Sequence, residues 1–277
     1  MKKQILLIVV LLLSLSTFAG RQHLQFNNSE FKILQVTDLH LMAKDQYALK
    51  NDSSFSLIRH MIEKEHPDLV MITGDIVVSY NAQEVWEELS QIFEEEKTCF
   101  AITFGNHDNE SDMAKEAVVK LLSRNSYYVE GNLAPSDISG IGNAYVPILS
   151  KDGSVSQWVL YLFDSHNLSQ DQGLGYYDWI KPDQIAWYRG VSDSLRSVNK
   201  KKLPAVAFFH IPFPEFNAAG SLVPAYGNKK EGVCAPYINS GLFASFLEKR
   251  DVIGAFVGHD HNNDYMADIN GNILLGY

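Results

Sequence analysis

The sequence predicts an α/β fold, because apolar strands alternate with amphipathic helices and polar side chains follow the strands. In the N-terminal half, the order strand then helix occurs three times. The strands are continuous apolar runs, as in residues 69–73, which is typical of parallel strands buried on both faces. We therefore expect parallel strands covered on both faces by helices, with ligands bound beyond the carboxyl ends of the strands.

The individual elements follow from apolar periodicity and from turn residues. The Asp-Gly pair at residues 152–153 and the segment 269–273 each indicate a hairpin. Residues 211–236 contain four prolines and few periodic apolar positions, which predicts a long surface loop, more often a binding lid than filler. We expect strands at residues 31–37, 69–73, 99–104, 143–149, 157–163, 205–209 and 252–257, and helices at 53–65 (capped by Asp52 or Ser53), 82–96, 111–123, 182–199 and from 239 or 240 to 249.

Composition is compatible with one large or two small globular domains and indicates an acidic surface. The chain has 277 residues, 46% of them hydrophobic, and a net charge of -10. This charge argues against a nucleic acid as partner, because nucleic-acid binding needs basic patches. We expect a single domain over residues 20–277. Strand-like sequence continues to Tyr277, so the sequence is also compatible with a fragment truncated at its C-terminal end.

The first 19 residues have the pattern of a signal peptide. Lys2 and Lys3 precede an apolar run at residues 5–13, and small and polar residues lead to a cleavage site after Ala19. We expect an exported protein, periplasmic or secreted, with no integral membrane domain after cleavage; the alternative is an uncleaved anchor. The two cysteines, Cys99 and Cys234, are expected to be unpaired thiols.

Side chains that bind metals follow five of the predicted strands. The most informative segment is Gly105-Asn106-His107-Asp108, where a glycine lets the chain turn and three polar residues follow a buried strand. Carboxylate and imidazole groups suit Zn, Fe or Mn, and the absence of cysteine from this set of candidate ligands argues against a closed structural zinc site. Seven candidate ligands suit two ions that share one carboxylate. They are Asp38, His40, Asp75, Asn106, His210, His259 and His261.

The ordered motifs resemble those of the calcineurin-like metallophosphoesterase superfamily, whose pattern is D-x-H, G-D, G-N-H-[DE], H and G-H-x-H. All five blocks occur here in that order, between residues 38 and 261. Residues 177–180, 238–243 and 258–264 resemble its purple-acid-phosphatase-like branch. The resemblance implies a four-layer α/β/β/α sandwich of two mixed β-sheets flanked by helices, whereas the alternating pattern alone indicates only α/β.

The resemblance also implies a role for each motif residue. Asp75 would bridge the two divalent ions, His107 would face the phosphate as a catalytic residue, and Asp108 would pair with His107 and orient it. The first ion would be held by Asp38, His40 and His261, and the second by Asn106, His210 and His259.

One motif departs from the true purple acid phosphatases. Those enzymes have D-x-G in the first block, and a tyrosine that binds Fe(III) three residues after the bridging aspartate. Here His40 and Val78 occupy these positions, and Tyr80 is two residues too far along. We therefore expect no tyrosinate–iron colour, and the metal (Mn, Fe or Zn) stays open.

The expected activity is hydrolysis of small phosphorylated substrates, foremost phosphomonoesters, by a metal-bound hydroxide. A phosphodiesterase or nucleotidase is the first alternative. It differs in the shape of the pocket, which the loops at 164–178 and 211–236 would set. The second is a metal-binding scaffold without catalysis. Since ligand histidines must be neutral, we expect metal loss and falling activity in strong acid. Side chains considered for the pocket wall are Asp164, His166, Tyr176, Tyr177 and Trp179.

Overall fold

The computed structural model describes residues 23–269, 271 and 273–277, with the backbone alone for residues 44–49. The predicted signal peptide at residues 1–19 lies outside these residues. No helix in the described part of the chain combines the length and the apolar character needed to cross a membrane.

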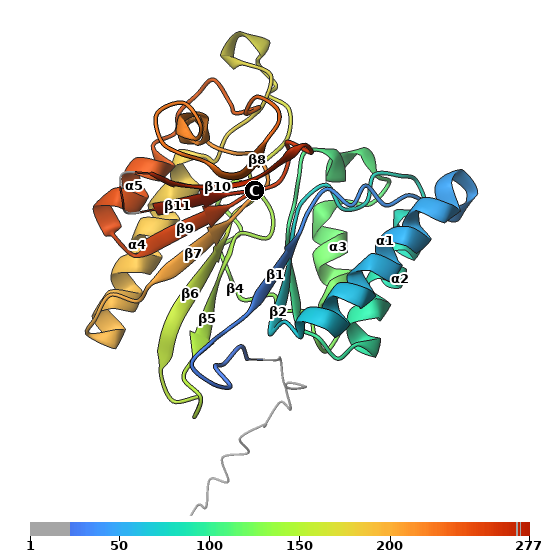
Figure 1. Ribbon diagram of the computed structural model, residues 1–277, viewed down its shortest axis with the longest axis horizontal. Helices are drawn as coiled ribbons and strands as arrows, with labels where there is room; N and C mark the ends of the chain where they lie inside the picture. The colour runs from blue at the N-terminus through green and yellow to red at the C-terminus, as the bar shows by residue number, and fades with distance from the viewer. Residues whose placement is uncertain (1–22, 270, 272) are drawn as a thin grey trace, which may run out of the picture.

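Two β-sheets face each other and carry helices on their outer faces, so the molecule has four layers (Figure 1). The smaller sheet is parallel, in the order β1-β2-β3, and the larger is mixed, in the order β4-β5-β6-β7-β9-β11-β10-β8. The smaller sheet comprises β1 (Ile33–Val36), β2 (Leu69–Thr73) and β3 (Phe100–Thr103). The larger comprises β4 (Asn132–Leu133), β5 (Ala144–Leu149), β6 (Ser156–Leu162), β7 (Ala205–Phe208), β8 (Tyr226–Lys229), β9 (Val252–Phe256), β10 (Asn263–Ile269) and β11 (Ile273–Gly276).

The helices divide between the two outer faces. In Figure 1, α1, α2 and α3 lie against the smaller sheet, and α4 and α5 lie against the larger. Three short 3₁₀ helices interrupt the loops. The helices are α1 (Lys44–Glu65), α2 (Ala82–Glu95), α3 (Lys115–Leu122), α4 (Pro182–Asn199) and α5 (Leu242–Lys249), and the 3₁₀ helices are η1 (His107–Glu110), η2 (Gln172–Leu174) and η3 (Pro214–Ala218).

The core between the sheets corrects one expectation, that helices cover both faces of the parallel strands. Leu69 and Met71 of β2 project toward Val146 and Leu160 of the larger sheet and form one apolar cluster with them. The alternate β2 residues pack on the helices instead. A second sheet therefore replaces one helical layer, and burying each such side chain contributes about 1.5–3 kcal/mol.

Two local expectations were also wrong. Helix α1 begins at Lys44 rather than near Ser53, so Asp52 and Ser53 lie inside it and do not cap it. The Asn51 side chain bonds to both backbone groups of Met42, just before the helix start. The segment 211–236 is not loop throughout, since it contains η3 and β8, which pairs antiparallel with β10 at the sheet edge. The expected hairpins are confirmed, with β5 antiparallel to β6 and β10 antiparallel to β11.

Parallel pairing decides where the site forms. Strands β1, β2 and β3 run parallel in one sheet, and β6, β7 and β9 run parallel in the other. Carboxyl ends of parallel strands meet at one edge of a sheet, so the residues that follow these strands lie close together. All candidate metal ligands follow β1, β2, β3, β7 or β9.

Candidate metal centre

The loops after β1 and β2 run side by side and present Asp38, His40 and Asp75. Asp38 N donates to the carbonyl of Gly74 (3.1 Å), and His40 N donates to that of Asp75 (2.9 Å). These three residues have positive φ angles of 54°, 45° and 51°. Such left-handed backbone costs roughly 1–2 kcal/mol for a residue with a side chain. With His259 (81°), four of the seven candidate ligands thus lie in strained backbone.

The candidate ligands form two groups that share Asp75. The first contains Asp38, His40, Asp75 and His261, and the second contains Asp75, His210 and His259; within each group the ligand atoms lie within 4.8 Å of one another. This arrangement is compatible with a dinuclear centre in which Asp75 contacts both ions.

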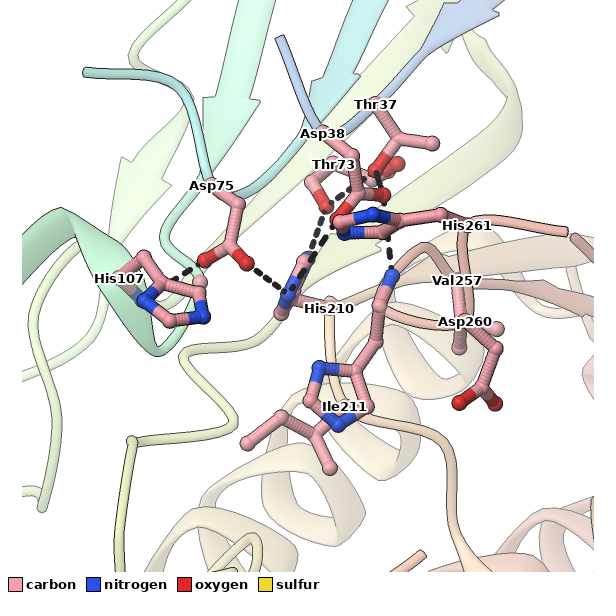
Figure 2. Close-up of polar contacts among 12 residues, drawn as sticks. Thr37, Asp38, Thr73, Asp75, His107, His210, Ile211, Val257, Asp260 and His261 are labelled. Carbon is pink, nitrogen blue, oxygen red and sulfur yellow. Dashed lines mark hydrogen bonds and ion pairs between the residues drawn. The ribbon is translucent and has the colours of Figure 1, made fainter. Parts of the chain in front are cut away.

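Short distances join the ligand atoms across the centre. His261 Nε2 lies 3.2 Å from Asp38 Oδ1, and His210 Nε2 lies 3.1 Å from Asp75 Oδ2. His40 Nε2 lies 3.3 Å from His261 Nε2. Figure 2 shows the Asp75 carboxylate between His107 and His210, with Asp38 beside His261. Nitrogen and oxygen donors thus face one another across distances that one ion can fill.

Five buried atoms at this centre have no hydrogen-bond partner among the described residues. A buried polar group left without a partner costs about 1–3 kcal/mol, so such atoms are rare. Five of them in one place form the donor set of a metal-binding site. Oxygen and imidazole nitrogen are the donors that Zn, Fe or Mn accept, so the residues fit two divalent ions. The atoms are Asp38 Oδ1, Asp75 Oδ2, Asn106 Oδ1, His210 Nε2 and His259 Nε2.

Hydrogen bonds to the other polar atoms of His210, Asp38 and Asp75 orient these three ligands. His210 Nδ1 donates to the Thr73 carbonyl (2.7 Å), so Nε2 is the nitrogen left for a metal. Asp38 Oδ2 accepts from Thr37 Oγ1 (2.7 Å) and from His259 N (3.0 Å). Asp75 Oδ1 accepts from His107 N (2.8 Å). Each aspartate therefore has one satisfied oxygen and one free oxygen.

The charges within the centre shift the pKa values of its ionisable groups. Burial disfavours the His210 imidazolium, but the adjacent carboxylate of Asp75 (3.1 Å) and the charge of Asp38 raise the pKa of His210 to about 9. Burial, and then the positive charge of His210, lowers the pKa of His259 to about 4. Burial opposes ionisation of Asp38 and Asp75, yet the histidines lower the pKa of both carboxyl groups. The centre holds excess negative charge, which divalent cations would neutralise.

Two glycines make the close approach of the loops possible. A Cβ atom at Gly105 would lie 2.2 Å from Asp75 Oδ1, and one at Gly258 would lie 1.9 Å from Thr37 Oγ1. Neither distance is compatible with a side chain. The glycines of the G-N-H-D and G-H-D-H segments are therefore required to bring Asp75 and Asp38 into the centre.

The expected pairing of Asp108 with His107 is wrong. Asp108 is buried (3% exposed), and its carboxylate accepts hydrogen bonds from the backbone N–H groups of Asp75, Ile76, Val77 and Gly105, at 2.7–3.2 Å. The η1 turn directs this side chain inward and His107 outward. Asp108 therefore holds the backbone of the bridging aspartate and does not orient the imidazole.

His107 lies at the edge of the centre with a different partner. Its ring centroid is 5.4 Å from that of His40, and its Nδ1 is 2.7 Å from Glu110 Oε1. The sequence reasoning missed Glu110, although its spacing of three residues from His107 places both on one face of a helical turn. The catalytic role of His107 stays a prediction.

A cavity of about 460 Å³ adjoins the centre on the side of His107. Tyr176 and Tyr177, which the sequence suggested for the pocket wall, do line it. Trp179 instead packs against Lys181, whose Nζ lies 3.7 Å from the centroid of the Trp179 ring. Tyr177 also packs edge-on against His259. The residues lining the cavity are Asn106, His107, Asn109, Glu110, Asn167, Leu168, Ser169, Gln170, Tyr176 and Tyr177.

Asp164 and His166 do not line this cavity. Asp164 forms a buried ion pair with Lys115 of α3 (3.1 Å), which joins the two halves of the sandwich, and His166 Nε2 contacts Gln184. Sequence reasoning did not single out Lys115. The two cysteines are free as expected, Cys99 half-buried and Cys234 exposed.

Comparison with known proteins gives consistent results. The sequence profile of the calcineurin-like phosphoesterase family matches residues 31–263. An Arabidopsis thaliana protein named probable inactive purple acid phosphatase 14 is 32% identical, over 91% of this chain and 71% of its own length. The Saccharomyces cerevisiae phosphatase DCR2 is also 32% identical, over 89% of this chain and 46% of its own length. A dimetal phosphatase from Danio rerio has a similar fold, with a TM-score of 0.57 and 11% identity over 89% of this chain and 86% of that one.

Proposed function

Since the chain belongs to the calcineurin-like phosphoesterase family, in its purple-acid-phosphatase-like branch, we propose that it hydrolyses phosphate monoesters at a centre of two divalent ions. The observation that carries this proposal is the convergence of five unpartnered buried donor atoms around Asp75. Mn, Fe and Zn are the ions that this donor set suits.

Two bound divalent ions would polarise the ester and generate a nucleophile from water at neutral pH. The protein ligands supply only two negative charges, from Asp38 and Asp75, because the histidines and Asn106 are neutral ligands. The loaded centre would therefore keep positive charge and attract a phosphate dianion, despite the net charge of -10 on the chain. Asp75 and Asp38 are fixed by their hydrogen bonds, so the ester meets a preorganised site.

The cavity beside the centre favours an uncharged leaving group. Its walls carry carboxamides and two tyrosines, one carboxylate, Glu110, and no lysine or arginine. A second phosphate group would find no lysine or arginine there, and His107 is the one lining side chain that can carry a positive charge. This supports a small phosphomonoester with a neutral ring or polyol over a polyphosphate. A phosphodiesterase or nucleotidase would use the same centre, and the assay described below distinguishes it from a phosphomonoesterase.

The printed names of the plant relatives include the word inactive. If that word also described this chain, the protein would be a metal-binding scaffold. A scaffold that had lost catalysis would be expected to lack some of the ligands or His107. All seven candidate ligands and His107 are present, which supports catalysis here.

The test uses protein reconstituted separately with Mn²⁺, Fe²⁺ and Zn²⁺ and assayed on p-nitrophenyl phosphate and bis-p-nitrophenyl phosphate. We expect two ions per chain and faster turnover of the monoester, with Asp75→Ala inactive. Faster turnover of the diester would establish the phosphodiesterase instead. Two bound ions with no turnover of either ester would establish the scaffold.

We also propose that the protein is exported, on the basis of residues 1–19. Expression of the whole chain in a bacterial host, followed by fractionation and N-terminal sequencing, tests this. A periplasmic or secreted product that begins at Gly20 is expected; a full-length product retained in the membrane would establish the uncleaved anchor.

A further inference from the structure

Glu110 provides a hydrogen-bond partner for the His107 ring. Glu110 Oε1 lies 2.7 Å from His107 Nδ1, and both residues belong to the single turn η1. An ionised carboxylate only accepts hydrogen bonds, so Nδ1 is the donor. The two side chains are 41% and 58% exposed and line the cavity beside the centre.

The residue first expected to orient His107 is unavailable for that role. Both oxygens of Asp108 are occupied by backbone N–H groups, at 2.7–3.2 Å. The backbone N–H of His107 is held by Asp75 Oδ1 (2.8 Å). Main chain and ring are thus fixed by two different carboxylates, and Nε2, on the opposite side of the ring from Nδ1, is left beside the cavity.

We propose that Glu110 is the positioning residue for His107 in ester hydrolysis. This inference rests on the proposed phosphatase function. The carboxylate fixes the ring through Nδ1–H, so that Nε2 faces the leaving group and can deliver a proton to it. As hydroxide derived from water bonds to phosphorus, the ester phosphorus–oxygen bond breaks, and its electron pair stays on the leaving oxygen, which takes the Nε2 proton. The imidazole is left neutral, with its Nδ1 proton still donated to Glu110.

Leaving groups of different basicity separate this role from a merely structural one. An alkoxide-like leaving group needs a proton, whereas 2,4-dinitrophenolate departs without one. For Glu110→Ala we expect kcat on phenyl phosphate to fall about 10- to 100-fold, less than the roughly 10²–10⁴-fold that the general acid itself contributes, because the imidazole is still present. On 2,4-dinitrophenyl phosphate we expect a change within about 3-fold, since no proton transfer is required. His107→Ala should show the same selectivity, and the double variant should add no further loss.

Matched variants make the comparison specific. Glu116→Ala removes an exposed carboxylate from α3 and should leave both substrates unaffected. Glu110→Asp should recover part of the phenyl phosphate activity. Equal losses on both esters, or no loss on either, would overturn the role of Glu110. No wild-type turnover of either ester, with two ions bound, would instead overturn the proposed phosphatase function.

A second measurement does not depend on activity. In the zinc-loaded protein, ¹⁵N-edited NMR of the imidazole nitrogens reports which nitrogen of His107 carries the proton, with His107→Ala assigning the signals. At a pH where the imidazole is neutral, we expect the proton on Nδ1 in the wild type and a shift toward Nε2–H in Glu110→Ala. An unchanged tautomer would refute the contact, even if the protein proved catalytically silent.

Discussion

The carboxylate of Asp108 accepts a hydrogen bond from the backbone N–H of Asp75, at 3.0 Å. The two residues are 33 positions apart, and the bond joins the turn after β3 to the turn after β2. Asp75 is the residue shared by both groups of candidate ligands. The position of the central ligand therefore depends on a buried acid that does not face the centre.

Replacing Asp108 should destabilise the metal-free protein. Asp108→Ala leaves four buried backbone N–H groups without their acceptor, and we expect the free energy of unfolding to fall by about 3 kcal/mol or more. Urea denaturation followed by circular dichroism measures this. Asp137→Ala, at an exposed loop position, is the matched control and should change stability by less than about 0.5 kcal/mol. A loss at position 108 no larger than the control would contradict the structural role.

The sharing of Asp75 predicts distinct metal stoichiometries. Asp75→Ala removes a donor from both groups, so we expect it to retain neither ion after gel filtration in metal-free buffer. His259→Ala disrupts only the group of Asp75, His210 and His259, so one ion should remain. Elemental analysis and native mass spectrometry count the ions. Full occupancy in Asp75→Ala would rule out the shared ligand.

The buried pair of Lys115 and Asp164 should be costly to break. Their side chains are 9% and 3% exposed, and removal of one partner from a buried pair typically costs about 3–5 kcal/mol. We expect Lys115→Met to lose stability in that range. Lys120→Met, on the exposed side of the same helix, is the control. Adding Asp164→Asn to Lys115→Met should recover part of the loss, because no uncompensated charge then remains; a further loss would show that the charges do not act as a pair.

Stability should decline above about pH 10, the ordinary pKa of tyrosine. Burial, and then the charge of Asp251, raises the pKa of Tyr161 and Tyr188, and burial raises that of Tyr265 to about 12. The unfolded chain ionises first, so their contribution is complete below pH 10 and is lost as the pH rises toward the folded-state value. In that window, each tyrosine that stays protonated in the folded protein lowers the free energy of unfolding by about 1.4 kcal/mol per pH unit. Urea denaturation at several pH values between 9 and 11.5 measures the slope.

Single substitutions identify the tyrosines responsible for that slope. Tyr188→Phe removes one of the shifted groups, so stability should fall less steeply with pH. Tyr237→Phe, at an 82% exposed position, should leave the slope unchanged. Identical slopes in wild type and Tyr188→Phe would exclude Tyr188 as a source of the alkaline instability.

The sequence was sufficient to predict the strand ends and the residues that meet there. Leu69–Thr73 is uniformly apolar and is followed at once by Gly74 and Asp75, a transition that packing alone does not explain. Helix α4 was also predictable to its ends, because Pro182 occupies the first turn and Asn199 precedes a left-handed residue. These features depend on local chemistry.

The remaining features depend on orientation or on distant contacts. The direction of the Asp108 side chain is set by the 3₁₀ turn, which the sequence did not reveal, and so its pairing with His107 was misassigned. Lys115 and Asp164 are 49 residues apart and come together only when the start of α3, on the smaller sheet, meets the end of β6 in the larger sheet. Strand β8 is polar and glycine-containing, so no period of two was visible.

The positive φ angles of the candidate ligands bear on how such a protein changes over evolutionary time. His40 and Asp75 occupy backbone regions that glycine adopts without cost, with φ angles of 45° and 51°. A change from ligand to glycine would relax the backbone while removing a metal donor. At Asp75 that relief is offset, because glycine would also leave the His107 N–H without its acceptor. Selection for the bound ions therefore acts more directly on His40 than on Asp75, whose carboxylate also holds the backbone.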